Sequence, residues 1–112
     1  MPDEIDLPLR PPVFHILLAL SQEERHGLGI ADEVEAASEG AMTLGPGTLY
    51  RSLDEMRDRG LLAPASGPSE GVDPRRKYYR LTESGRALLA AEVGRLERLV
   101  DLAKVRIAGE RA

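Results

Sequence analysis

The chain has 112 residues, a net charge of −4 and no cysteine, and 42% of its residues are hydrophobic. This length fits one domain with a modest core, and the absence of cysteine excludes disulfides and thiolate metal sites, so we expect oligomerisation to add stability. No apolar run approaches the roughly 18 residues that span a membrane, and the acidic N-terminus lacks the basic start of a secretory signal, so we expect a cytoplasmic protein with no membrane partner.

The chain begins with a polar arm that leads into an apolar segment. Residues 1–12 include Pro8, Pro11 and Pro12, which disfavour a regular helix, and we expect a flexible arm there. Residues 13–21 are almost continuously apolar and suit a buried helix. A buried strand is the alternative that periodicity does not exclude.

A second helical pattern follows a polar break over residues 22–27. Over residues 28–40, Ile30 and Val34 share one face and acidic residues lie off it. This arrangement is typical of an amphipathic helix that packs against a core.

Residues 46–60 carry the clearest helical pattern. Pro46 suits the first turn, where its missing N–H costs nothing, and a glycine at position 60 ends the helix. Leu49, Leu53 and Met56 are spaced by four and three residues and form a core-facing stripe. The polar or small residues off this stripe that could contact a partner are Gly47, Thr48, Tyr50, Arg51 and Ser52.

A β-hairpin is predicted next. Leu61 and Leu62 begin one strand, residues 64–74 are rich in turn formers, and residues 75–82 form the returning strand. Tyr79 is expected to face the core. The basic residues of the returning strand are Arg75, Arg76, Lys77 and Arg80.

The charge of the chain is unevenly distributed. Residues 1–40 hold nine acidic and two basic residues, whereas residues 41–81 hold five acidic and seven basic ones. Because the local field decides whether a polyanion binds, the net acidity does not exclude nucleic acid. Taken alone, however, a basic run is as well explained by a solvated face.

The last segment is predicted to be a long helix that pairs with a second chain. Thr82 is a good N-cap, Glu83 lies favourably in the first turn, and the pattern continues to about Ala108. A helix of about 26 residues is roughly 40 Å long, more than a domain of this size covers. A heptad-like seam suggests dimerisation, and it consists of Leu89, Val93, Leu96, Val100, Ala103 and Ile107.

Nothing in the sequence indicates catalysis, a cofactor or a metal site. His15 lies in an apolar segment and is expected to be structural, whereas His26 precedes a helix and is expected to cap it. Two separated histidines without cysteine have no convincing ligand spacing. There is also no P-loop and no local grouping of Ser, His and Asp.

Three motifs in this order resemble the PadR family of bacterial transcriptional regulators. GTLYRSLDEMRDRGLL is similar to the family's recognition helix, RRKYYRLTESGRALL to its junction between wing and last helix, and HGLGI to the start of its second helix. The resemblance covers roughly residues 13–107. Two departures are Leu28, where tyrosine is usual, and Arg51-Ser52, where proline is frequent after the tyrosine.

The resemblance implies a mostly α-helical winged helix-turn-helix fold with a small β-hairpin. It divides the chain into the arm (1–12), a DNA-binding domain (13–82) and a dimerisation helix (83–112). Without the resemblance, a solvated helix face is the simpler explanation for residues 47–52. With it, residues 47, 48 and 50–52 of the third helix are expected to contact the major groove, and the hairpin with its basic returning strand to lie along the phosphate backbone or the minor groove.

The leading hypothesis for function is a homodimeric, sequence-specific repressor that binds a palindromic operator in double-stranded DNA and is released by an unknown signal, such as a small-molecule effector. A winged-helix module that binds proteins and no longer binds DNA is the alternative, which the acidic residues of the third helix favour. A small-molecule sensor or carrier is a third possibility.

Overall fold

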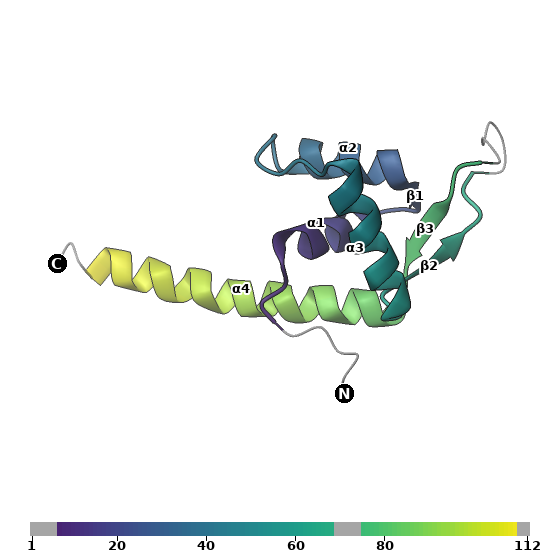
Figure 1. The fold of residues 1–112 in the computed structure, drawn as a ribbon. Coiled ribbons are helices and arrows are strands. Elements are labelled where there is room, and N and C mark those ends of the chain that lie inside the picture. The colour runs from purple at the N-terminus through teal and green to yellow at the C-terminus, as the bar shows by residue number, and fades with distance from the viewer. Residues whose placement is uncertain (1–6, 69–74, 110–112) are drawn as a thin grey trace.

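The computed structural model describes residues 7–68 and 75–109. Its elements in chain order are α1 (Pro11–Leu20), β1 (Arg25–His26), α2 (Gly27–Ala37), α3 (Pro46–Asp58), β2 (Leu62–Ala65), β3 (Tyr78–Leu81) and α4 (Glu83–Gly109). In Figure 1, α1, α2, α3 and the sheet form a head beside the first half of α4, whose second half extends away. Three pieces of the expected arrangement lie outside the described residues, namely 1–6 of the arm, 69–74 of the hairpin tip and 110–112 of the last helix.

The first helix begins earlier than the sequence suggested. Pro11 and Pro12 occupy the first two positions of α1, where a helix needs no N–H donor and the fixed φ of proline suits the backbone. The preceding Leu9 is also part of the fold, since its side chain is 7% exposed. The expectation of a flexible arm therefore does not hold for residues 9–12. For the apolar segment that follows, the structure selects the helix over the strand.

The sheet is larger than the predicted hairpin. β2 and β3 pair antiparallel with Leu62 opposite Leu81, as expected. β1, which lies in the expected polar break, pairs with the other edge of β3 and places Arg25 opposite Tyr79. A strand of two residues is too short to produce an alternating pattern, so periodicity could not have indicated it.

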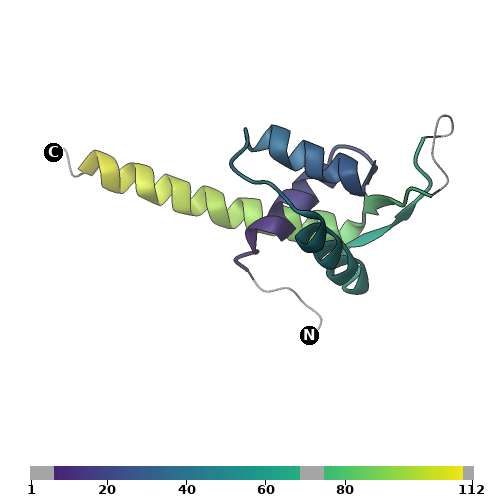
Figure 2. The same ribbon diagram turned by 45° about the horizontal axis from the view of Figure 1, so that its top comes forward.

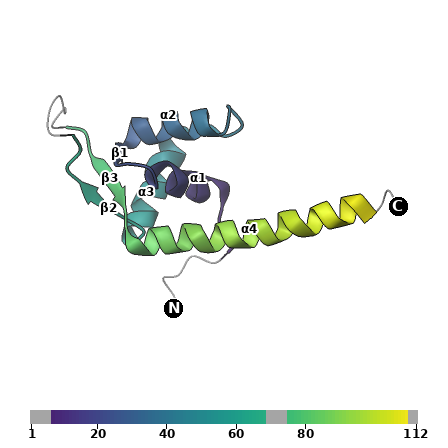
Figure 3. The same cartoon turned by 180° about the vertical axis from the view of Figure 1, so that it is seen from behind.

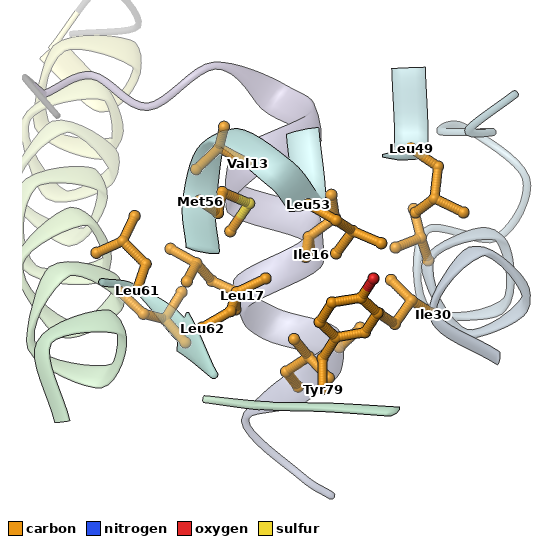
Figure 4. Packing of buried hydrophobic residues seen from close by; sticks show 14 of the residues in the cluster. Val13, Ile16, Leu17, Ile30, Leu49, Leu53, Met56, Leu61, Leu62 and Tyr79 are labelled. Atoms are coloured by element: carbon orange, nitrogen blue, oxygen red, sulfur yellow. The ribbon is translucent and has the colours of Figure 1, made fainter. Parts of the chain in front are cut away.

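One apolar cluster connects the elements of the head to the start of α4 (Figure 4). The predicted stripe of α3 lies inside it, and Tyr79 packs there as expected, at 6% exposure. The buried members of the cluster are Leu9, Val13, Ile16, Leu17, Ala19, Leu20, Ile30, Val34, Leu49, Leu53, Met56, Leu61, Leu62, Tyr79 and Leu89.

α4 is buried against the head over its first three turns. Thr82 caps it as predicted, because its Oγ1 accepts a hydrogen bond from the N–H of Gly85 at 3.0 Å. Glu92 is the last buried residue of the helix, and every residue from Val93 to Gly109 is at least partly exposed. Figures 2 and 3 show this second half extending past the head from two further directions. Among the described residues, no helix is both long and apolar enough to cross a membrane.

Candidate nucleic-acid interface

α3 has a core face and a solvent face. Leu49, Leu53 and Met56 are buried, so the side of the first two turns opposite to them faces solvent, as a helical wheel predicts. The predicted contact residues on this exposed surface are Gly47, Thr48, Tyr50 and Arg51. A helix presented in this way can enter the major groove of a duplex, which is wide enough to admit it.

Ser52 does not belong to this surface. Its side chain is only 7% exposed, because at 3.6 residues per turn it lies about 60° from Leu49 and within the arc that the core covers. We expected Ser52 to contact DNA because a hydroxyl can bond phosphates and base edges. Its position on the helix contradicts that expectation, and we remove it from the interface.

The acidic residues of α3 lie toward its C-terminal end and are partly neutralised there. The guanidinium of Arg57 lies 3.8 Å from a carboxylate oxygen of Asp54 and 3.7 Å from one of Asp58. Arg51 lies one to two turns closer to the N-terminus and is exposed. The first turns of α3 are therefore better suited to a polyanion than the composition of the whole helix suggests.

The returning segment of the hairpin exposes positive charge around the buried Tyr79, although its strand β3 covers residues 78–81 and not the predicted 75–82. Its exposed basic residues are Arg75, Arg76, Lys77 and Arg80. Burial, with a contribution from the Asp54 carboxylate, raises the pKa of the Tyr79 phenol. The phenol is therefore neutral at physiological pH and serves as a packing group, while the arginines and the lysine supply the charge.

β1 fixes the base of the hairpin to the head. The Arg25 Nε donates a hydrogen bond to the carbonyl oxygen of Ala19 at 2.9 Å, and its Nη2 donates to Gln22 Oε1 at 2.8 Å. The His26 ring packs at 5.3 Å, between centroids, against the ring of Tyr78. We expected the His26 side chain to cap α2, but it makes no capping hydrogen bond. The ring is instead tilted by 55° against that of Tyr78 in the hairpin.

A groove of about 390 Å³ runs between the start of α2, α3 and the hairpin, and it brings together residues that the sequence keeps far apart. The residues that line it are His26, Gly27, Leu28, Tyr50, Asp54, Arg75, Arg76, Lys77 and Tyr79. Three of these are basic and one is acidic, so the groove suits an anionic partner. Thr48, Arg51 and Arg80 do not line the groove. The first two share the exposed surface of α3 with Tyr50.

His26, Gly27 and Leu28 were missing from the predicted contact residues. Of these three residues, only Gly27 carried a sequence signal, namely the absence of a side chain. A Cβ on Gly27 would lie 2.6 Å from the Tyr50 hydroxyl oxygen, so the lack of a side chain there lets the tyrosine pack against the start of α2. A glycine in the first turn of a helix can be interpreted as a point of close approach only when the residue that packs against it is known.

The second half of α4 exposes apolar side chains along the face that the head covers in the first half. Val93, Val100 and Ile107 are 39%, 50% and 55% exposed. Val93, Leu96 and Val100 line a groove of about 400 Å³ together with Phe14 of α1. The predicted seam is wrong at Leu89, which is 8% exposed and packed in the head's own core.

No group of three or more His, Asp or Glu side chains that could hold a metal ion is found in residues 7–68 and 75–109.

Comparisons with known proteins identify relatives of this fold. Residues 16–91 match the family model described as "Transcriptional regulator PadR-like family". The chain is similar to a PadR family transcription regulator from Clostridium difficile, with 21% identity, a TM-score of 0.72 and coverage of 88% of this chain and 99% of that one. A PadR-like transcription factor from Bacteroides fragilis has 26% identity and a TM-score of 0.66, over 82% of this chain and 85% of that one. Bacillus subtilis PadR in complex with operator DNA has 23% identity and a TM-score of 0.64, over 75% of this chain and 47% of that one. A search of curated protein sequences gives no match.

Proposed function

The chain belongs to the PadR-like family of transcriptional regulators, and from this premise we propose that it represses transcription by binding a palindromic operator as a homodimer until a signal releases it. The family is one of regulators and not of enzymes, and its winged-helix fold is the one described above.

The observation that carries the proposal is the groove that connects α3 to the basic segment 75–77, which leads into β3 of the hairpin. Tyr50 of α3 and the three consecutive basic residues 75–77 line the same groove. A duplex whose major groove accepted the first turns of α3 would place its phosphates beside this basic segment. Bacillus subtilis PadR, which has a similar fold, is in complex with operator DNA, and this supports DNA as the partner of the interface.

Within this interface the side chains have different roles. Arg51 is the candidate for reading a guanine through its O6 and N7 atoms, which is the commonest specific contact of arginine. Thr48 and Tyr50 are placed to bond phosphates, and Gly47 allows close approach because no other group lies within 4 Å of where its Cβ would be. The basic residues of the hairpin bind the phosphate backbone without reading sequence.

A second copy of the chain is the proposed partner for the exposed half of α4. The apolar groove at Val93, Leu96 and Val100 is formed by α1 and α4 together, so the α4 of a partner can pack between them. A homodimer joined in this way has a two-fold axis, and its two α3 helices match two half-sites about 34 Å apart.

Release by a small molecule would act at the same junction. An effector between α4 and the heads would favour a dimer whose α3 helices are spaced wrongly for the operator. Phe14 is the one aromatic residue that lines the groove there, and α4 has no aromatic residue. We therefore propose that an effector of this chain is small or aliphatic and that planar polyaromatic compounds bind weakly.

The test of DNA binding is fluorescence anisotropy with the duplex found upstream of the chain's own gene, because many small repressors bind their own promoters. Arg51→Ala should weaken operator binding by about 1–3 kcal/mol and relax specificity at one position of each half-site. Lys77→Ala should weaken all duplexes similarly and reduce the salt slope by about one unit.

The matched control is Arg98→Ala, which removes an exposed arginine from α4 instead of α3 and should leave both quantities unchanged. If Arg51→Ala binds as well as the original chain, the reading surface is assigned wrongly. If neither operator nor random duplex binds, the protein-interaction module becomes the better hypothesis.

A further inference from the structure

The two residues before α1 connect the two helices that the proposed function needs. The N–H of Leu9 donates a hydrogen bond to Oε2 of Glu92 on α4 at 2.8 Å. The neighbouring Arg10 donates from Nη2 to Oε2 of Glu55 on α3 at 2.9 Å. A segment of two residues therefore links α4 to α3, and we call it the 9–10 link.

Glu92 is the firmer of the two attachment points. Its residue is 2% exposed, and Arg95 donates to both of its carboxylate oxygens, from Nε at 2.5 Å and from Nη2 at 3.1 Å. These hydrogen bonds lower the pKa of the Glu92 carboxyl, and those from Arg95 have a larger effect than the one from Leu9. The carboxyl is therefore ionised at neutral pH. A buried carboxylate is costly unless it is fully bonded, and here its partners come from two different parts of the chain.

The pair between Arg10 and Glu55 is weaker. Its side chains are 64% and 35% exposed, and an ion pair in such a position contributes little to stability. The side chain of Leu9, by contrast, is buried in the core. The 9–10 link is therefore held mainly by burial of Leu9 and by the Glu92 carboxylate.

The hydrogen bond between Leu9 and Glu92 lies at the point where it can most affect the direction of the second half of α4. Glu92 is the last buried residue before the helix leaves the head. From there to Gly109 the helix continues for about 25 Å, so a tilt of about 10° at Glu92 would move its end by about 4 Å. A small loss of restraint at this point therefore becomes a large displacement along the half of α4 that is proposed to pair.

We propose that Glu92 is a positioning residue. By holding the 9–10 link against α4, it fixes the angle between the head and α4, and through that angle it sets the spacing of the two α3 helices in the dimer. The second part rests on the proposed function, whereas the angle is a property of one chain and can be measured without DNA or a dimer.

The experiment measures the angle as a distance within one chain. The sequence has no cysteine, so spin labels can be placed at Asp32→Cys on α2 and Val105→Cys on α4, both at exposed positions. Double electron–electron resonance on this protein, diluted with excess unlabelled chain, reports the distance from head to α4. With Glu92 present we expect one narrow distribution. With Glu92→Ala we expect it to broaden by about 4 Å or more.

Glu83→Gln is the control, because it removes an exposed carboxylate from the first turn of the same helix and should leave the distribution narrow. If Glu92→Ala does not fold by circular dichroism, Glu92→Gln replaces it under the same criteria, because it keeps the shape and loses the charge. A distribution that stays as narrow in the folded Glu92 variant as in the parent overturns the proposal.

A second measurement separates this proposal from the proposed function. Asp32→Cys alone, undiluted, reports the distance between the two heads of a dimer. If the parent gives no interchain signal, the homodimer is refuted, while the distance within one chain still decides the role of Glu92. If the parent gives a narrow interchain distance, Glu92→Ala should broaden it together with the intrachain one, and broadening of only the intrachain distance overturns the link to α3 spacing.

Discussion

The first prediction concerns Gly85, where α4 approaches the backbone of the hairpin. Gly85 is buried in the first turn of α4. A Cβ at this position would overlap the carbonyl oxygen of Leu61 and would lie 2.8 Å from Cδ1 of Leu81. The Leu61 carbonyl cannot retreat freely, because it accepts a hydrogen bond from the N–H of Thr82 at 3.2 Å. The obstacle to Gly85→Ala is therefore backbone and not the tip of a mobile side chain.

Two opposing effects determine the size of the change. Alanine in place of glycine inside a helix is favourable by about 0.5–1 kcal/mol. Overpacking that forces a backbone shift costs typically about 1–3 kcal/mol. The second effect is the larger, so we expect Gly85→Ala to lower the free energy of unfolding by about 1–2 kcal/mol. Gly94→Ala is the matched control in the same helix, because its Cβ would lie 3.6 Å from the flexible Arg98 Nη1 and should gain about 0.5–1 kcal/mol.

The assay is the unfolding of both variants in urea, with circular dichroism as the signal. It is carried out at several protein concentrations, because the stability of a dimer depends on concentration. We expect the midpoint of Gly85→Ala to fall and that of Gly94→Ala to rise, with similar slopes. Equal stabilisation of both variants would refute the close approach of α4 to the hairpin.

Three further predictions concern the groove, the dimer and pH. Gly27→Ala should push the Tyr50 ring out of the groove, since the new Cβ would lie 2.6 Å from its hydroxyl oxygen, and anisotropy should show weaker operator binding while the protein stays folded. Leu96→Asp should give monomers in sedimentation velocity at micromolar concentration, whereas Val105→Asp, at an exposed position on α4 outside the groove at Leu96, should remain dimeric. Because the folded-state pKa of Glu92 lies below its ordinary value of 4.5, its ionised form contributes stability above that value and loses it as the pH falls through the folded pKa. The difference in unfolding free energy between the original chain and Glu92→Gln should therefore shrink in acid, and a difference independent of pH would contradict this.

Several features of the head could be predicted because they depend on local pattern. The stripe of Leu49, Leu53 and Met56 needed only the helical period, and its burial confirms the wheel. Thr82 as an N-cap and Tyr79 as a core residue followed from residue type and alternation in the same way. The predicted DNA contact of Ser52 is wrong because it rested on the chemistry of the hydroxyl, whereas the position of Ser52 on the same wheel places it toward the core.

Other features depend on where distant segments meet, and no local pattern contains that information. The groove needs the start of α2 beside Tyr50 and the basic segment 75–77, and β1 has two residues and hence no period. The hydrogen bond between Leu9 and Glu92 joins residues that are 83 positions apart. Leu89 was assigned to a dimer because a heptad pattern does not reveal where the head ends.

The face of α4 explains why that last error arises and what corrects it. The same side of the helix is apolar from Leu89 to Ile107, so hydrophobicity alone predicts one continuous contact. The structure divides it, since the head buries residues up to Glu92 and leaves the rest at least partly exposed. A carboxylate such as that of Glu92 would destabilise a continuous apolar seam, because a buried charge needs hydrogen-bonded partners. At the edge of the head it has them in Arg95 and the N–H of Leu9. In this chain the charged Glu92 therefore lies where the head stops burying α4 and the rest of the apolar face becomes available to another chain.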